Sequence, residues 1–600
     1  MAKFTSLVDM QEKACTQHAS NRLFGVKRDG AYRWMTYAEF AELVDAFRGA
    51  LAALGVGRGD RVAVIANNRV EWAVAAYATY GLGAFYVPMY EAQLPKDWRY
   101  IIEDSEAKVV LVANEAIYEQ VRAFTDEIAT LEHVLCFDAP PERDYSYHAH
   151  LERGRNSPTE RVYPEPDEIA GLIYTSGTTG KPKGVVLTHG NFTSNINAVH
   201  DVFPLGSSDV SLSFLPWAHS FGQTCELHCM LSLGAGMGLA ESVQTLMVNF
   251  GEVRPTVLFS VPRIFNRIYD GLQKKMDEEG GLKKALFDRG IAVAQQRRRL
   301  EEQGRRSLWL DLQYSFFDKL VFSKIRDRLG GRLKYAFSGG AALAREVAEF
   351  IDDVGIVVYE GYGLSETSPI VTCNRPGARK IGSVGPPIPG VRVLILDENN
   401  REQPPETDGE VCVIGPNVMK GYWKRPEETA EVIFDYQGER CFRTGDMGRL
   451  DRDGFLYITG RIKEQYKLEN GKYVVPAPLE EQLKLSGFIN QVMIYGMNRP
   501  YNVALVVPDR EAITKWAREQ GIAVDDYEKL LRDPRVHDKI GEEIAKFGAD
   551  FKGYERPRKW LLLAEEFSPD NDMLTPTLKL KRRNVIKRYQ EQIEALYKDD

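Results

Sequence analysis

The chain has 600 residues, of which 44% are apolar and 27% are charged, as in ordinary globular proteins. This length exceeds what one hydrophobic core usually organises, so we expect two or more domains. The net charge of −8 argues against a nucleic-acid partner, no apolar run reaches the ~18 residues of a spanning helix, and the seven cysteines are scattered. With no apolar signal core at the N-terminus, the sequence predicts a cytoplasmic protein.

The first part of the chain alternates two kinds of pattern. Helical spacing of apolar residues occurs at 37–54 and 72–80. Short apolar strands are expected between and after these helices, at 61–66, 84–88, 108–113 and 132–136. This alternation predicts α/β layers with largely parallel sheets.

A loop rich in glycine, hydroxyl and lysine residues lies between two expected strands, 169–174 and 185–187. Glycines let backbone N–H groups approach an anion, hydroxyls donate to phosphate oxygens, and lysines add positive charge. The spacing does not fit a Walker A loop, and a generic hairpin turn is the alternative. The candidate phosphate-binding residues are Thr175, Ser176, Gly177, Thr178, Thr179, Gly180, Lys181 and Lys183.

Three segments in the middle of the chain leave alternatives open. Residues 213–222 are apolar and aromatic with one histidine, His219, which either gates a pocket or caps a turn. Cys225 and Cys229 flank a histidine, but the spacing matches no zinc pattern, so buried thiols are the favoured interpretation. Residues 271–330 are expected to form a charged helical insertion, with an apolar face of Phe317, Leu320, Val321, Ile325 and Leu329 on one side of a helix. This insertion either packs on the main body or contacts a membrane or partner through its arginines.

Residues 333–367 carry two glycine-rich turns after short strands. One follows the strand 333–337, and the other, 359–367, follows an apolar run at 355–358. A strand that ends in glycines and an aromatic residue suits a purine ring, and Glu366 would be a hard oxygen ligand for magnesium on ATP. A helix start capped by Ser365 or Thr367 is a compatible interpretation.

Asp446 and Arg461 come next, near the end of the large expected domain. A carboxylate is the natural acceptor for two vicinal ribose hydroxyls, whereas an unpaired surface aspartate is the alternative. Arg461 opens a charged link at 461–464, followed by a smaller α/β segment of ~140 residues. Its lysine-rich end, 574–583, would be read as a basic tail on composition alone.

Taken in order from about residue 36 to 583, these motifs resemble those of the adenylate-forming superfamily, which includes acyl-CoA synthetases, luciferases and peptide-synthetase adenylation domains. Residues 261–270, 321–326 and 574–583 are most similar to long-chain fatty acid–CoA ligases (AMP-forming). The resemblance implies an α/β fold with a large N-terminal domain of layered α/β subdomains, 1–460, which carries the insertion at about 271–330. It also implies a hinge at 461–464, centred on Lys463, and a small mobile α/β lid domain, 465–600.

The resemblance also assigns roles to individual residues. Tyr362 would flank adenine, and Glu366 with Thr175 would hold Mg²⁺. Asp446 and Arg461 would bind the ribose and phosphates. Family members usually have proline where Ala342 stands, a mild departure. The remaining implied nucleotide-binding residues are Gly339, Gly340, Ala341, Glu360, Gly361, Gly363 and Ser365.

Two lysines are implied to serve different half-reactions. Lys579 would act in adenylate formation and Lys467 in thioester formation. The glycine that usually precedes the first lysine is replaced by Leu578 in this chain, so Lys581 stays open as an alternative. The acyl pocket would be walled by Trp217, His219 and Phe221.

The expected reaction is activation of a long- or medium-chain fatty acid by ATP and Mg²⁺, followed by transfer to coenzyme A. No aspartate near 213–222 could pair with an amino acid's ammonium group, which argues against an amino-acid substrate. A fatty acyl-AMP ligase that loads a separate carrier protein and a catalytically silent lipid-binding relative are the alternatives. We expect a cytoplasmic enzyme with peripheral contact at the inner membrane face and no nucleic-acid partner.

Overall fold

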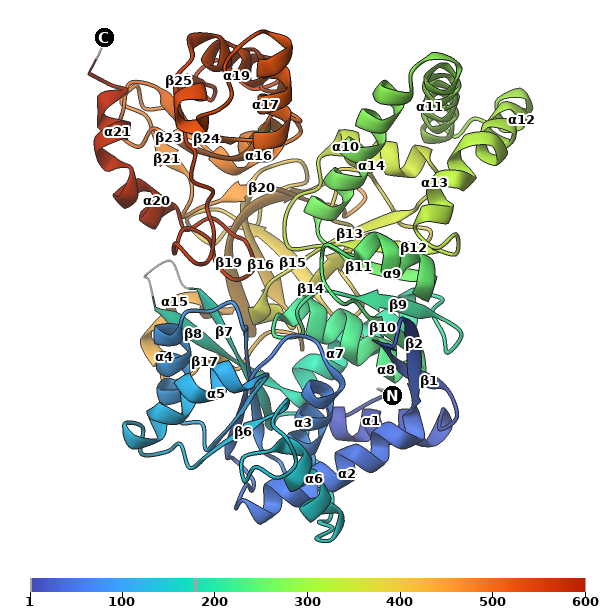
Figure 1. Ribbon diagram of the computed structural model, residues 1–600, viewed down its shortest axis with the longest axis vertical. Coiled ribbons are helices and arrows are strands. Elements are labelled where there is room, and N and C mark those ends of the chain that lie inside the picture. The colour runs from blue at the N-terminus through green and yellow to red at the C-terminus, as the bar shows by residue number, and fades with distance from the viewer. Residues whose placement is uncertain (1–2, 177–180, 599–600) are drawn as a thin grey trace.

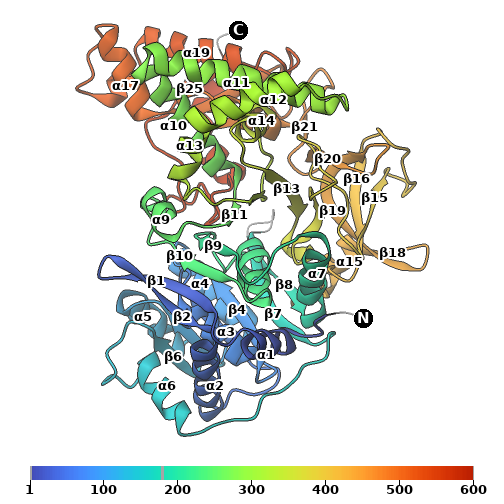
Figure 2. The same ribbon diagram turned by 90° about the vertical axis from the view of Figure 1, so that its right-hand side faces the viewer.

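The computed structural model describes residues 3–176 and 181–598. The chain forms a large body that ends at β20 (Leu456–Arg461) and a smaller C-terminal unit, which lies above it in Figure 1. A helical arm, residues 262–328, rises from the large body on the same side as the C-terminal unit (Figures 1 and 2). The predicted α/β fold with a large N-terminal part and a small C-terminal domain is confirmed.

The first sheet of the large body has seven strands in the order β17-β8-β7-β4-β3-β5-β6. Its β3, β4, β5, β6 and β7 run parallel, while β8 pairs antiparallel with both β7 and β17. The parallel strands are rich in valine and isoleucine because helices cover the sheet. The strands are β3 (Arg61–Ile65), β4 (Phe85–Met89), β5 (Val109–Val112), β6 (His133–Cys136), β7 (Ile169–Ser176), β8 (Pro182–Thr188) and β17 (Gly421–Tyr422).

The helices around this sheet confirm the predicted alternation, with ends that differ by one or two residues. Helix α2 begins at a capping box in which Thr36 and Glu39 exchange hydrogen bonds, which fixes its first turn. The helices of this region are α1 (Leu7–Gln17), α2 (Tyr37–Ala53), α3 (Val70–Tyr80), α4 (Pro95–Ser105), α5 (Glu115–Val121), η1 (Arg122–Asp126), α6 (Tyr147–Arg155) and α7 (His189–Val202).

A second sheet of eight strands has the order β14-β13-β12-β11-β9-β10-β1-β2. Its central strands, β11 to β13, are parallel, so their carboxyl ends meet at one edge, where open α/β sheets commonly bind ligands. The strands are β1 (Arg22–Arg28), β2 (Ala31–Thr36), β9 (Val210–Ser213), β10 (Gly236–Leu239), β11 (Val257–Ser260), β12 (Tyr335–Ser338), β13 (Val358–Gly363) and β14 (Ile370–Cys373). The helices are η2 (Phe221–His228), α8 (Cys229–Ser232), α9 (Leu246–Val253), α14 (Arg345–Asp353) and η4 (Ser365–Thr367).

A third, antiparallel sheet completes the large body. Strand β19 is its centre and pairs with β16, β18 and β20, and β15 pairs with β16. The bounds are β15 (Arg392–Leu396), β16 (Gly409–Ile414), α15 (Pro426–Val432), β18 (Ile433–Tyr436) and β19 (Glu439–Leu450).

The predicted insertion is helical but starts earlier than expected, at Pro262. It comprises α10 (Pro262–Glu279), α11 (Gly281–Glu302), α12 (Leu308–Phe317), the π-helical turn η3 (Asp318–Phe322) and α13 (Ser323–Arg328). Phe317 and Leu329 are buried and Val321 and Ile325 pack against the same core, as predicted. Leu320, predicted to share that face, is instead exposed, and it lies within the wider π-helical turn.

The C-terminal unit is built on the sheet β23-β24-β25, with apolar clusters on both faces. Its elements are β21 (Tyr466–Lys467), β22 (Tyr473–Val474), α16 (Pro476–Leu483), β23 (Ile489–Tyr495), β24 (Asn502–Pro508), α17 (Arg510–Glu519), α18 (Tyr527–Leu530), α19 (Pro534–Phe547), β25 (Pro557–Leu562), α20 (Arg582–Arg588) and α21 (Gln590–Ala595). Leu485 and Phe547 of this unit pack into the apolar cluster that the helical arm shares with the second sheet. None of the described helices has the length and apolarity needed to cross a bilayer.

Candidate active site

The loops after β12 and β13 bring most of the predicted nucleotide-binding residues to one edge of the second sheet. Ser338, the last residue of β12, is in register with Glu360 of β13. Gly339, Gly340 and Ala341 follow directly, and Gly340 has a φ of +84° that favours glycine. Gly363 also needs to be glycine, because a Cβ there would meet the carbonyl oxygen of Pro369 at 1.8 Å. The backbone at this edge of the sheet therefore requires glycine at positions 340 and 363.

Asp446 is held by two residues from different elements. It lies on β19 opposite Arg461 of β20, and its Oδ1 accepts a hydrogen bond from Arg461 Nε at 2.8 Å. Its Oδ2 accepts a hydrogen bond from the hydroxyl of Tyr362 at 2.6 Å. Burial, together with the charge of Asp446, raises the pKa of Tyr362, so this tyrosine stays a donor. The three residues thus form a rigid, pre-oriented acceptor for hydroxyl groups.

Glu366 lies in η4, beside the β7–β8 hairpin. Its Oε1 accepts a hydrogen bond from the hydroxyl of Tyr422 at 2.9 Å, and its backbone oxygen accepts one from Met419 N–H at 2.8 Å. Tyr422 lies on β17, which pairs with β8 at Val185. Sequence reasoning missed Tyr422, because no motif marks an aromatic residue that becomes adjacent only through strand pairing.

The described part of the phosphate loop is a β-hairpin. Thr175 is in register with Lys183, and Ser176 is in register with Pro182. Lys183 Nζ lies 3.2 Å from Glu428 Oε2 and 5.2 Å from the centre of the Tyr422 ring. Lys181 Nζ lies 5.3 Å from the centre of the Tyr100 ring. Gly177, Thr178, Thr179 and Gly180 lie outside the described residues.

Lys579 comes from the C-terminal unit and reaches the same site. Crowding by protein atoms lowers its pKa, and the nearby charge of Arg461 lowers it further, while Asp446, Glu366 and Glu464 act in the opposite direction. The residue is nevertheless exposed to solvent, so protein atoms crowd it without enclosing it. The charge of Lys579 also acts on His219. The lysine is therefore close to both the nucleotide-binding edge and the expected acyl pocket.

Lys581 has a different environment. Its Nζ lies 2.5 Å from Asp572 Oδ1, and Asp572 also pairs with Lys96 of the large body at 3.1 Å. Lys581 is thus engaged in the contact between the two units. The structure brings Lys579, and not Lys581, into the set of charges around Glu366 and Asp446.

The expected acyl-pocket residues take three different positions. The Phe221 ring lies 3.4 Å from the point where a Cβ on Gly339 would stand, and Ser220 Oγ lies 3.2 Å from Ser365 Oγ. His219 is half-buried, and desolvation together with the charge of Lys579 lowers its pKa to about 3, so it is neutral. Trp217 is fully buried between Phe24 and Trp72 in the main core.

The helix that follows this segment, η2, is anchored by a buried carboxyl group. Glu226 Oε1 accepts a hydrogen bond from Ser211 Oγ at 2.7 Å, and its Oε2 accepts one from Ser213 Oγ at 2.8 Å. Burial raises the pKa of Glu226 to about 7. These contacts hold η2, a π-helix that begins at Phe221, and π-helical turns are frequent at functional sites.

The remaining predicted residues lie outside this cluster. Lys463 is in a turn closed by hydrogen bonds from Glu464 and Gln465 N–H to Arg461 O, at 3.2 and 3.0 Å. Lys467 is exposed on β21, with its Nζ 4.9 Å from the centre of the Tyr473 ring. Glu360 is buried, and burial raises its pKa to about 7. Cys225 and Cys229 are buried thiols, and within the described ranges no three metal-ligating side chains form a cluster.

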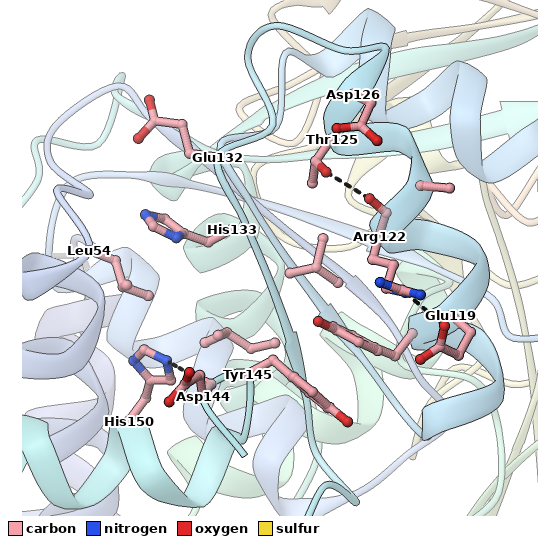
Figure 3. Close-up of a pocket in the computed structure, with 14 residues that line it drawn as sticks. Leu54, Glu119, Arg122, Thr125, Asp126, Glu132, His133, Asp144, Tyr145 and His150 are labelled. Atoms are coloured by element: carbon pink, nitrogen blue, oxygen red, sulfur yellow. Dashed lines mark hydrogen bonds and ion pairs between the residues drawn. The ribbon is translucent and has the colours of Figure 1, made fainter.

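A surface concavity of about 700 Å³ lies elsewhere, between η1, β6 and α6 (Figure 3). Arg122 at its rim donates to Glu119 Oε2 at 2.7 Å, and His150 Nε2 lies 2.8 Å from the backbone oxygen of Asp144. None of the predicted nucleotide-binding residues lines it. The concavity is therefore separate from the candidate active site.

Comparisons with known proteins agree with this geometry. A family model described as AMP-binding enzyme matches residues 11–423, and one described as AMP-binding enzyme C-terminal domain matches residues 463–600. The chain is 33% identical to the peroxisomal long chain acyl-CoA synthetase 7 of Arabidopsis thaliana, over 97% of this chain and 85% of that protein. It is 34% identical to the long-chain-fatty-acid–CoA ligase FadD15 of Mycobacterium tuberculosis, over 95% and 93% of the two chains.

Solved structures show the same fold at lower identity. The adenylation domain of a carboxylate reductase from Mycobacterium chelonae superposes with a TM-score of 0.79 at 24% identity, covering 100% of this chain and 92% of that one. The anthranilate CoA ligase AuaEII, in complex with anthranoyl-AMP, superposes with a TM-score of 0.73 at 20% identity, covering 99% of both chains. The family models and the relatives above 30% identity together show that this chain belongs to the AMP-binding, adenylate-forming enzyme family.

Proposed function

We propose that the chain is a long-chain fatty acid–CoA ligase (AMP-forming), which activates a long- or medium-chain fatty acid with ATP and transfers the acyl group to coenzyme A. The observation that carries this proposal is the approach of Lys579, from the C-terminal unit, to Glu366, Asp446 and Arg461 of the large body. The names of the relatives, which are long-chain acyl-CoA synthetases and ligases, support the choice of acid.

The first half-reaction would join the acid to AMP. A carboxylate is a poor electrophile, because its leaving group would be oxide, and attack on the α-phosphate of ATP gives a mixed anhydride and pyrophosphate. Negative charge builds up on the α-phosphoryl oxygens, where Lys579 and Arg461 would neutralise it. Asp446, fixed by Tyr362, would accept hydrogen bonds from the ribose hydroxyls and so hold the nucleotide in register.

The donor set around Glu366 suits Mg²⁺. Magnesium in nucleotide sites is typically held by one or two carboxylates together with substrate phosphates and waters. Glu366 supplies one carboxylate, whose Oε1 is oriented by Tyr422, and Thr175 would add a hydroxyl oxygen. A magnesium ion held there would neutralise phosphate charge during the transfer.

The second half-reaction would need a different arrangement of the two units. A thiol must reach the acyl carbon, and Lys579, as we propose it for the first half-reaction, would limit that access. We propose that the C-terminal unit turns about the link that contains Lys463 and presents the β21 face with Lys467 to coenzyme A. The small number of hydrogen bonds that close this link is compatible with such a motion.

The predicted pocket favours an uncharged acyl chain. His219 is neutral, Phe221 is apolar, and residues 213–222 contain no acidic side chain that could pair with an ammonium group. We therefore propose a fatty acid of long or medium chain, acting in the cytoplasm with peripheral contact at the inner membrane face.

Pyrophosphate release with a series of saturated fatty acids tests this proposal. We expect ATP-dependent release that rises with chain length into the medium or long range and is absent with free amino acids. If none of the acids in the series supported pyrophosphate release, the proposal would be contradicted and a catalytically silent relative favoured. Acyl-AMP that accumulates without thioester, even with coenzyme A present, would favour a fatty acyl-AMP ligase.

A further inference from the structure

Helix α12 of the arm has apolar side chains on both of its sides. Leu310, Tyr314 and Phe317 pack towards the apolar cluster of the arm. On the other side, four large apolar side chains face solvent, with exposed fractions of 89% for Leu308, 66% for Trp309, 64% for Leu312 and 59% for Phe316. A helix on the surface of a globular protein normally presents polar residues on its outer side. The fold does not explain this exposed face.

The exposed residues form one continuous stripe. Leu308, Leu312, Phe316 and Leu320 recur at intervals of four, and Trp309 lies beside the first two. We call these five residues the α12 face. Helix α12 lies at the outer edge of the molecule in Figure 1, on the side away from the candidate active site. A contiguous exposed apolar surface of this kind marks an interaction site.

Exposed positive charges flank the α12 face. Arg305 and Arg306 come directly before the helix, and Lys319 follows it. Within the described part of the chain, none of the ion pairs involves these three residues, and all three are exposed. Glu301 and Asp311 share Arg297, and Asp318 pairs with Arg326, while residues 297–328 together carry nine lysines and arginines against five acidic residues. The face is therefore locally basic in a chain of net charge −8.

We propose that the α12 face docks on an anionic phospholipid bilayer. Trp309, Leu312 and Phe316 would enter the boundary between headgroups and acyl chains, and Arg305, Arg306 and Lys319 would contact the phosphates. Aromatic and aliphatic side chains beside exposed cations are the composition of helices that lie in this boundary. In a symmetric contact with another copy, Arg305, Arg306 and Lys319 would face the same cations of that copy, whereas an anionic bilayer presents the opposite charge, so the basic surroundings favour the bilayer. The inference assigns a surface to the peripheral membrane contact proposed above, and it does not depend on the proposed reaction.

Flotation of the full chain with lipid vesicles tests the inference. We expect the protein to bind vesicles of phosphatidylcholine and phosphatidylglycerol, and to bind pure phosphatidylcholine weakly. Leu312→Glu, a change at an exposed position, should weaken binding about tenfold or more. Arg305→Ser combined with Arg306→Ser should weaken it on the order of 30-fold, because two phosphate contacts are lost. Leu282→Glu, at an exposed leucine of α11 outside the α12 face, is the matched control and should bind like the wild type.

Three results would overturn the proposal: no binding to anionic vesicles, an equal loss of binding in Leu312→Glu and Leu282→Glu, or a dimer in light scattering that Leu312→Glu dissociates. Activity distinguishes this proposal from the catalytic one. Leu312→Glu should leave pyrophosphate release with a soluble medium-chain acid unchanged. Failure of that release in the wild type would count against the proposed reaction and not against vesicle binding.

Discussion

At the scale of single residues, the turn that presents Lys579 combines tight hydrogen bonding with local strain. Thr575 N–H donates to Lys579 O at 2.8 Å, and Lys579 N–H donates to Thr575 Oγ1 at 3.0 Å. Leu578 between them has a φ of +61°, in the left-handed region, which costs a non-glycine residue about 1 kcal/mol. The family's usual glycine at this position would adopt this conformation without that cost. The two hydrogen bonds between Thr575 and Lys579 stabilise the turn, and they hold the backbone of Lys579 in place.

We predict that Lys579 and Lys581 contribute differently to the rate of acyl-adenylate formation. Lys579→Ala should slow acyl-adenylate formation about 10²–10³-fold, because a cation next to the developing phosphoryl charge is lost. Lys581→Ala should keep most of this rate, because Lys581 pairs with Asp572. Single-turnover formation of acyl-AMP measures both.

The control for this pair is the second half-reaction. Lys579→Ala should still form thioester from supplied acyl-AMP and coenzyme A. An equal loss of both half-reactions, or a larger loss in Lys581→Ala than in Lys579→Ala, would show that the assignment is wrong.

Glu226 predicts a pH dependence of stability. Its pKa in the folded chain is about 7, above the unfolded value of 4.5, because of burial. The folded chain therefore keeps a proton that the unfolded chain releases, and stability falls as pH rises from about 4.5 to about 7. The full effect is about 3 kcal/mol, as an order of magnitude. Glu226→Gln should remove this contribution, so its melting temperature should fall less than that of the wild type between about pH 5 and about pH 8.

Calorimetry of both proteins across this range is the measurement. Other buried acids with raised pKa values, such as Glu360, titrate in both proteins, so the difference between the two profiles isolates Glu226. Parallel profiles would mean that Glu226 does not titrate in this window.

Individual site residues could be predicted from the sequence only where a motif fixes them. Asp446 and Arg461 were predicted as partners of one nucleotide, and they do lie together because β19 and β20 pair at these positions. Tyr422 could not be predicted, since its contact with Glu366 depends on β17 pairing with β8, in which Tyr422 lies opposite Val185, 237 residues earlier in the chain. Trp217 illustrates the same limit, because an aromatic residue in a pocket motif can equally serve the core.

At the scale of elements, regular strands were easier to predict than the helical arm. The strands 61–66 and 108–113 were predicted within a residue or two, because continuous apolar runs bounded by polar residues have few alternatives. In the arm, the π-helical turn Asp318–Phe322 alters the helical phase, and Leu320 becomes exposed. Periodicity arguments assume a uniform helix and cannot anticipate such a turn.

The arm and the C-terminal unit meet through a reciprocal pair of contacts between α10 and α17. Lys274 Nζ lies 4.0 Å from Glu511 Oε1, and Lys515 Nζ lies 3.9 Å from Glu278 Oε1. Because these groups are exposed, each pair contributes no more than about 1 kcal/mol. Both pairs require the arrangement of the two units that the structure shows. Substitutions in these two ion pairs can therefore shift the equilibrium between the arrangement that the structure shows and the one proposed for thioester formation.

We predict that reversing one side of this contact slows acyl-adenylate formation. Lys274→Glu combined with Glu278→Lys should reduce its rate about fivefold at most, because like charges then face each other. Adding Glu511→Lys and Lys515→Glu should restore the rate, since both attractive pairs re-form. Thioester formation from supplied acyl-AMP should change little. A double variant that the second pair of reversals does not rescue would mean that the contact does not contribute.

At the scale of the whole molecule, the proposed active site needs residues from both units. The large body supplies Glu366, Asp446 and Arg461, and the C-terminal unit supplies Lys579. Lys467 lies outside this set, on β21. In the proposed reaction, one arrangement therefore serves adenylate formation, and thioester formation requires another. The ionic contact of Asp572 with Lys96 would have to break in that change.

The most direct test of the proposed reaction measures ATP- and palmitate-dependent formation of AMP, with and without coenzyme A, together with mass spectrometry of the acyl product. We expect palmitoyl-AMP to stay bound at about one per chain without coenzyme A, and AMP and palmitoyl-CoA to form over many turnovers with it. Palmitoyl-AMP that never becomes a thioester in the presence of coenzyme A would contradict the central claim.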